Sequence, residues 1–278
     1  MLYKVDLIPR NWMVEAESQP VFFYADESWI EIEGKKHLVL GSLATSRPGP
    51  MANEVAKLKR DLGLQPFDEI KWNSSKYSEA LRHSISNGIL QLITGSIGVI
   101  SIVEGQDKQH AVELLTTQIG DCCDYYNIPS YIMNLDQGLI NRQKEFTDFL
   151  GQRKHPLCLG LHVLDSSCDQ LIQCTDIFVG FYRTAMRQEL EGRATYIPNT
   201  DESFADIRLA WSFLEHVQFW TRGILWGNED SLYEELMQGK EPYRRSINMG
   251  FRIHSSISAE TKNLLETRIA TVYMGCLH

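Results

Sequence analysis

The sequence lacks long hydrophobic runs, paired cysteine motifs and a surplus of basic residues. No apolar stretch approaches the roughly 18 residues of a membrane span, and residues 1–6 do not have the basic-then-apolar layout of a signal peptide. The six cysteines contain no Cys-x-x-Cys pair, so we expect reduced thiols and no structural zinc site. These absences predict a cytoplasmic protein without a membrane partner.

The net charge of −9 excludes a broad, sequence-blind grip on nucleic acid, which needs a basic surface. It does not exclude a nuclease, because acidic metal ligands add negative charge that bound cations reverse locally. No Gly-x-Ser-x-Gly elbow and no glycine-rich phosphate loop occurs in the chain. The sequence therefore disfavours a serine hydrolase.

An apolar run beginning at Val21 leads directly into Asp26 and Glu27. Such a run predicts a buried central strand over 21–28. An unpaired carboxylate at its end would be costly to bury, so we expect a divalent metal to compensate Asp26. Neighbouring side chains of a strand point to opposite faces, so we expect Glu27 to face away as an outer-shell or structural residue.

Hydrophobic periodicity predicts an α/β fold with a mixed sheet flanked by helices. Strands are expected at 21–28, 37–44, 96–103, 129–135 and 157–164, a turn at 33–36, a loop at 45–50, and helices at 51–62, 77–94, 107–126, 139–150 and 168–191. Residues 1–20 are expected to form an N-terminal extension and 193–278 a helical C-terminal appendage, with helices at 203–226 and 259–274. The aromatic residues of 203–226 favour core packing or a homodimer face over base stacking.

Three further acidic residues lie on separate predicted elements. Glu69 precedes the second helix, Asp136 follows a strand, and Asp176 lies within a helix among apolar neighbours. Each has a plainer interpretation, as a surface, turn or paired residue. Together with Asp26 they offer four oxygen donors of the kind that Mg²⁺ and Mn²⁺ prefer, and two such ions can promote phosphodiester hydrolysis.

These motifs resemble the RNase H-like nuclease superfamily and, more closely, a bacterial family catalogued as domain of unknown function 3800. The matching stretches are 23–28, 69–72, Leu135-Asp136, Asp165-Ser166 and 173–176, and the resemblance covers roughly 20–190. The chain departs from the family's pattern at Trp29, where glycine is usual, and at Thr175, where alanine is usual. The resemblance implies an RNase H-like domain at 21–192 and metal-dependent cleavage of nucleic acid.

In the mechanism that this resemblance implies, Asp26 bridges two Mg²⁺ or Mn²⁺ ions. Glu69 and Asp136 complete one metal site, and Asp176 completes the other. Gln173 is expected in the outer shell, beside the helical stripe that carries Asp176. Lys71 either contacts the scissile phosphate or is a solvated lysine.

Arg183 and Arg187 continue the same helical stripe and have two interpretations. Either they bind phosphates, or they pair with Glu189 and Glu191 on the surface. Two alternatives to the nuclease also stay open. One is a non-catalytic module on the same fold that binds nucleic acid or protein, and the other is a hydrolase of small nucleotide phosphates.

Overall fold

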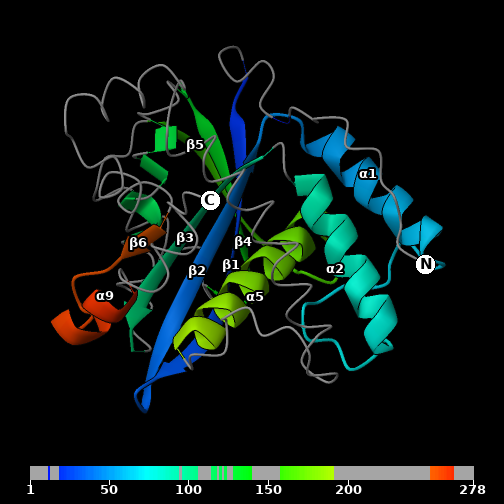
Figure 1. Ribbon diagram of the computed structural model, residues 1–278. Helices are drawn as coiled ribbons and strands as arrows, with labels where there is room; N and C mark the ends of the chain where they lie inside the picture. The colour runs from blue at the N-terminus through cyan, green and yellow to red at the C-terminus, as the bar shows by residue number, and fades with distance from the viewer. Residues whose placement is uncertain are drawn as a thin grey trace, which may run out of the picture.

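The computed structural model describes residues 12, 19–93, 96–105, 114–117, 119–120, 122–123, 128–139, 157–190 and 251–265. These residues form a six-stranded sheet in the order β5-β4-β1-β2-β3-β6, flanked by helices (Figure 1). Strand β2 is antiparallel to β1 and to β3, whereas the β1–β4, β4–β5 and β3–β6 pairs are parallel. The predicted α/β class with a mixed sheet is confirmed.

The strands are β1 (Val21–Ile32), β2 (Lys35–Thr45), β3 (Ile97–Glu104), β4 (Tyr131–Asp136), β5 (Cys158–Leu164) and β6 (Phe251–Ile253). The helices are α1 (Pro48–Asp61), α2 (Glu79–Ile93), α5 (Gln170–Leu190) and α9 (Ala259–Leu265). The helix expected at 203–226 lies outside the described residues, and so does that at 139–150 apart from Leu139, which lies in a turn. Of 107–126 only 114–117, 119–120 and 122–123 are described, all helical. No helix in the described part of the chain is long and apolar enough to cross a membrane.

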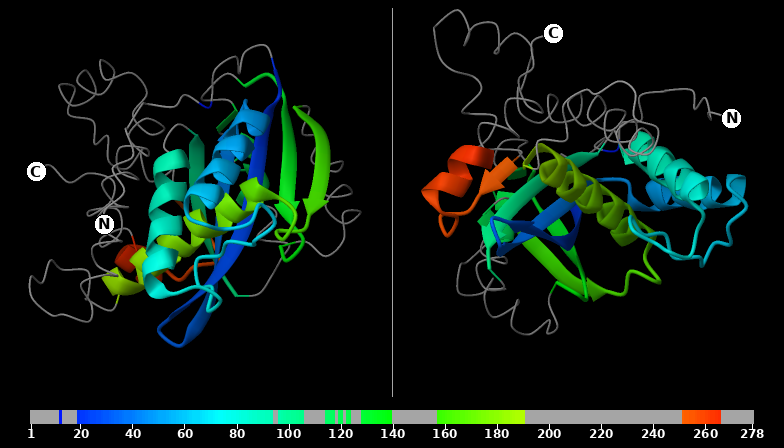
Figure 2. Two further views of the ribbon diagram at one scale, coloured as in Figure 1. Left: turned by 90° about the vertical axis from the view of Figure 1, so that its right-hand side faces the viewer. Right: turned by 60° about the horizontal axis from the view of Figure 1, so that its bottom comes forward.

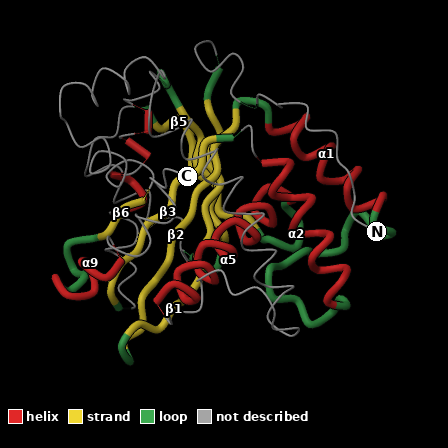
Figure 3. The backbone as a smooth tube through the Cα atoms, viewed as in Figure 1, coloured by secondary structure: helices red, strands yellow, loops and turns green. Residues whose placement is uncertain are grey.

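The β1–β2 hairpin is the centre of the sheet (Figure 3). Val21, Phe23 and Ala25 are fully buried, as the apolar run predicts for a strand covered on both faces. Strand β1 extends to Ile32, beyond its predicted end. Glu33 and Gly34 both have positive φ, 52° and 75°, which suits a two-residue hairpin turn.

Helices α1, α2 and α5 cover one face of the sheet (Figure 2). Helix α5 packs directly on β1 and β2, and α1 and α2 pack beside it. Its approach is close at Gly41 of β2, where an added Cβ would overlap the Val179 side chain and lie 3.0 Å from Ile100. Gly41 pairs with Asp26 across the hairpin, so this approach brings α5 to the strand position that carries Asp26.

Three features differ from the sequence-based expectations. The first turn of α1 is formed by Pro48, Gly49 and Pro50, which were predicted to lie in a loop. Proline is tolerated there because the backbone N–H that it lacks would have no hydrogen-bond partner within the helix. Trp12, from the expected N-terminal extension, is buried and donates a 2.7 Å hydrogen bond from Nε1 to the Leu92 carbonyl. Strand β6, from the expected helical appendage, extends the sheet beside β3.

Replacing Gly41 with alanine is expected to destabilise the fold by about 1–3 kcal/mol, because the new methyl group overpacks the α5–β2 contact. Urea denaturation would measure the change in the free energy of unfolding. Gly49→Ala is the matched control, since a Cβ there meets nothing within 4 Å. Equal stability of the Gly41→Ala and Gly49→Ala variants would contradict the close approach of α5.

Candidate metal centre

Asp26 and Asp136 lie side by side where β4 ends. The parallel pairing of β1 and β4 runs as far as Ala25 with Leu135, so the next residues of the two strands are the two aspartates. Asp26 is only 6% exposed, and its Oδ1 accepts a 2.7 Å hydrogen bond from the Glu27 backbone N–H. The carboxyl end of a parallel strand pair is where α/β sheets collect ligands, and here it carries two carboxylates.

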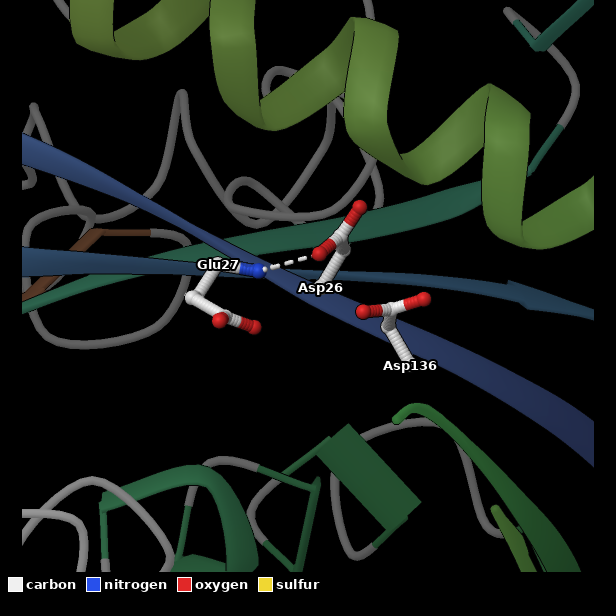
Figure 4. Close-up of side chains that lie close together, drawn as sticks. All are labelled: Asp26, Glu27 and Asp136. Carbon is white, nitrogen blue, oxygen red and sulfur yellow. Dashed lines mark hydrogen bonds between the residues drawn. The ribbon is translucent and has the colours of Figure 1, made fainter. Parts of the chain in front are cut away.

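Glu27 completes a three-carboxylate cluster with Asp26 and Asp136. One ligand oxygen from each residue lies within 4.8 Å of the other two. Figure 4 shows Asp26 leaving β1 toward α5 and Glu27 leaving on the opposite side, as strand alternation requires. The opposite face of β1 is the one expected for Glu27, yet its carboxylate still lies close to Asp26 and Asp136, and its outer-shell or structural role stays a prediction. The pairing of β1 with β4 ends at Ala25, so beyond that residue this edge of β1 has no neighbouring strand, and side chains from both faces of β1 can reach the site there.

The surroundings of Asp26 disfavour its negative charge. Burial raises the pKa of its carboxyl group well above the ordinary value, and the charges of Asp176, Glu27 and Asp136 raise it further. The hydrogen bond from the Glu27 N–H acts in the opposite direction and is the weakest of these effects. Asp26 is therefore a buried carboxylate that a nearby cation would stabilise.

Asp176 approaches this cluster from α5 without joining the group of three. Its charge has the strongest influence of the three neighbouring carboxylates on Asp26, although Asp176 is not part of the group whose oxygens lie within 4.8 Å of one another. Asp176 Oδ2 accepts a 2.8 Å hydrogen bond from the Trp72 backbone N–H. Burial raises the pKa of Asp176, while that hydrogen bond and the charges of Lys71 and Arg183 oppose the rise.

Glu69 is held apart from the cluster by other partners. Its Oε1 accepts a 2.9 Å hydrogen bond from Ser166 Oγ and forms a 2.9 Å ion pair with Lys71 Nζ. This ion pair raises the pKa of Lys71, and the charges of Asp176 and Asp136 also favour the protonated lysine. Lys71, half exposed, is thus the cation that faces the acidic residues.

Gln173 is only 2% exposed, and both the oxygen and the nitrogen of its side-chain amide form hydrogen bonds with other protein groups. Its Oε1 accepts hydrogen bonds from Lys59 Nζ at 2.9 Å and from the Ile70 N–H at 3.3 Å. Its Nε2 donates to the Ser166 carbonyl at 2.6 Å. These partners place Gln173 beneath the segment that carries Glu69 and Lys71, where it positions that segment on α5.

Trp72 and Gly138 also contribute to the site, although the sequence analysis gave neither of them a role there. Trp72 packs on Gly180, where a Cβ would collide with its ring, and its Nε1 donates a 2.9 Å hydrogen bond to Thr184. Gly138 donates its N–H to Asp136 Oδ2 at 2.7 Å, and a Cβ there would lie 2.7 Å from that oxygen. The Asp-x-Gly spacing after a strand was the available signal for Gly138.

The cluster fits a hard divalent cation on three grounds. Its donors are all carboxylate oxygens, the ligand type that Mg²⁺ and Mn²⁺ prefer. Asp136 Oδ1 is buried and has no hydrogen-bond partner. A Cβ at Gly138 would lie against both Asp136 and Glu27, so the glycine leaves the space beside these carboxylates open.

Comparison with known proteins adds no assignment. No protein-family model matches the chain, and neither a curated protein nor a solved structure gives a match.

Replacing Asp26 with asparagine is expected to stabilise the metal-free protein increasingly as pH rises. The raised pKa of Asp26 means that the folded state keeps a proton that the unfolded state releases above about pH 3.9. Between that value and the raised pKa, the free energy of unfolding of the wild type therefore falls as pH increases. Asparagine removes this loss, which is about 1.4 kcal/mol for each pKa unit.

Urea denaturation in EDTA, repeated at several pH values from about 4 to 8, would measure this difference. Asp61→Asn, at the exposed end of α1, is the control for the loss of one acidic charge. A pH profile of Asp26→Asn no steeper than that of Asp61→Asn would contradict the raised pKa of Asp26.

Proposed function

We propose that the chain is a metal-dependent nuclease that hydrolyses phosphodiester bonds of nucleic acid with two Mg²⁺ or Mn²⁺ ions. The observation that carries the proposal is the meeting of Asp26, Glu27 and Asp136 within 4.8 Å, with Asp176 acting electrostatically on the same buried aspartate. Structural ion-pair networks usually alternate charge signs, whereas this cluster places like charges together. Such a cluster is typical of a site that binds cations.

An RNase H-like fold is part of this proposal. It is supported by a mixed sheet whose central strand carries Asp26, whose neighbouring parallel strand ends at Asp136, and whose covering helix carries Asp176. These are the placements that the resemblance to the superfamily implies.

The carboxylates divide into two groups around Asp26. Glu27 and Asp136 form the three-carboxylate cluster with Asp26 (Figure 4). Asp176 belongs to α5, from which its charge acts on Asp26. Asp26 is thus the ligand that two metal sites would share. Ions held there would supply a more acidic water molecule and would stabilise charge on the leaving oxygen.

Lys71 binds the substrate phosphate in this proposal. Its ammonium group already faces the charges of Asp176 and Asp136 and is half exposed, so it can donate a hydrogen bond to a phosphate oxygen beside the cluster. Glu69 is then a positioning residue rather than a metal ligand, because its Oε1 holds Lys71 and accepts from Ser166. This assignment replaces Glu69 with Glu27 in the ligand set.

Asp26→Asn and Asp176→Asn are each expected to lower nuclease activity more than about a hundredfold. Loss of a residue that only supports a metal ligand lowers activity up to about a hundredfold, so loss of a ligand itself should lower it further. The assay uses single-stranded and duplex DNA and RNA with Mg²⁺ or Mn²⁺, and mononucleotides as alternative substrates. The Asp61→Asn variant controls for a general loss of acidic charge. Full activity in both Asp26→Asn and Asp176→Asn would refute the proposal, and cleavage of mononucleotides alone would favour a nucleotide-phosphate hydrolase.

Calorimetric titration with Mn²⁺ separates the two candidate ligand sets. Glu27→Gln is expected to weaken Mn²⁺ binding about tenfold or more, because it removes a charged donor from the three-carboxylate cluster. Glu69→Gln should change the Mn²⁺ affinity less, since Glu69 Oε1 already forms an ion pair with Lys71 and accepts a hydrogen bond from Ser166. A larger effect at Glu69 than at Glu27 would restore Glu69 as the ligand.

A further inference from the structure

Two arginines follow Asp176 along α5. Arg183 lies two helical turns beyond Asp176, about 10 Å along the axis and on the same face, because seven residues complete almost two turns. Arg187 lies one further turn along, about 6 Å from Arg183. Helix α5 therefore carries two positively charged residues on the same face as Asp176, leading away from the acidic cluster.

Arg183 is held close to the site and is half-buried, whereas Arg187 is exposed. The positive charge of Arg183 acts on Asp176, and Arg187 acts on Arg183 as a neighbouring like charge. Burial and this repulsion both lower the pKa of the Arg183 guanidinium, and Asp176 is the nearby charge that favours its protonated form. A guanidinium stays charged in proteins under these conditions.

Neither arginine forms a direct ion pair among the side chains that the structure describes. The ion pairs found there are Lys35–Glu104, Lys71–Glu69, Lys76–Asp68 and His83–Glu79. The side chains of Glu189 and Glu191, the two surface partners considered from the sequence, are outside the described part of the structure. Asp176 acts on Arg183 as a nearby charge, but it also faces the acidic cluster. Two adjacent cations, one of them half-buried, form an arrangement that a further anion would stabilise.

We propose that Arg183 and Arg187 bind a backbone phosphate of a polynucleotide, away from the bond that is cleaved. This inference rests on the proposed nuclease function and extends it to the class of substrate. The planar guanidinium fork matches two phosphate oxygens at once, which suits recognition of a nucleic-acid backbone without regard to sequence.

The spacing determines the length of substrate that uses this subsite. A distance of about 10 Å corresponds to two or three nucleotides along a strand that rises 3.4 Å for each nucleotide. A mononucleotide or dinucleotide at the acidic cluster would not reach Arg187, one turn beyond Arg183, whereas an oligonucleotide would. Because the chain carries a net charge of −9, local cations are needed to hold such a substrate.

The test compares cleavage of a dinucleotide with cleavage of an unstructured 12-nucleotide strand, made as DNA and as RNA. For the long strand, Arg183→Gln and Arg187→Gln are each expected to raise KM about tenfold. Arg187→Gln should change kcat less than twofold and should leave KM for the dinucleotide unchanged, because its lost contact is remote from the reaction. Arg183→Gln also removes a charge that acts on Asp176, so only its effect on KM and on the salt slope for the long strand is used. The slope of log(kcat/KM) against log[salt] for the long strand should become shallower by about one in each variant.

Lys36→Gln is the matched control. Lys36 is an exposed cation that pairs with Glu31 on β1, five residues beyond Asp26 and therefore about 16 Å away along the strand. Its variant should keep the wild-type KM and salt slope. Arg187→Gln also controls for misfolding, because the exposed Arg187 can be replaced without disturbing the packing of α5.

Binding of the 12-nucleotide strand to the Asp26→Asn protein, followed by fluorescence anisotropy, separates this inference from the nuclease proposal. If Arg183→Gln and Arg187→Gln in that background both weaken binding, the subsite is supported whether or not the wild type cleaves. If the wild type cleaves and both arginine variants match it in KM, salt slope and binding, the subsite is refuted and the nuclease proposal stands. An equal rise in KM for the dinucleotide would also overturn the assignment to a remote phosphate.

Discussion

The arrangement of the site depends on one buried charge, the carboxylate of Asp26 at the point where β4 stops. The strand cannot bury this group cheaply without a counter-charge, yet its nearest charged neighbours are Asp176, Glu27 and Asp136. The excess of like charge is not compensated within the cluster; Lys71 lies at its edge, paired with Glu69. Bound divalent cations would resolve this conflict, because in the proposed arrangement Glu27 and Asp136 would share one ion with Asp26 and Asp176 would share a second.

The rest of the fold positions α5 and the segment from Pro66 to Trp72 around that charge. Gly41 lets α5 lie close to the sheet at the strand position of Asp26. Along α5, Gln173, Asp176, Gly180 and Thr184 each contact the segment, through hydrogen bonds to Ile70 and Trp72 and through packing of the Trp72 ring. Lys59 is fully buried and donates to the Asp68 and Pro66 carbonyls and to Gln173, which fixes the segment from its other side. Lys71 therefore reaches the acidic residues from a backbone that is anchored at both ends.

The sequence predicted five of the six strands and indicated Asp26, Asp136 and Asp176 as candidate site residues, because apolar runs and strand-end aspartates are local signals. The burial of Asp26, the strand end at Asp136 and the helical position of Asp176 all follow from such signals. Glu27 leaves the opposite face of β1, as alternation predicts, but its proximity to Asp136 was not predicted, because it depends on β1 having no β4 neighbour after Ala25. The partners of Glu69 were not predictable either, since Ser166 is distant in sequence and its contact depends on the fold. The first turn of α1 was missed because a Pro-Gly-Pro run favours a loop unless it begins a helix.

The central claim is that Asp26 is a metal ligand at the meeting point of two strands and α5. Anomalous diffraction from a crystal soaked in Mn²⁺ tests it most directly. The account predicts a manganese peak about 2 Å from an Asp26 carboxylate oxygen, with Glu27 or Asp136 as a second ligand, and a second peak toward Asp176. A well-diffracting soaked crystal with no manganese beside Asp26 would contradict the account.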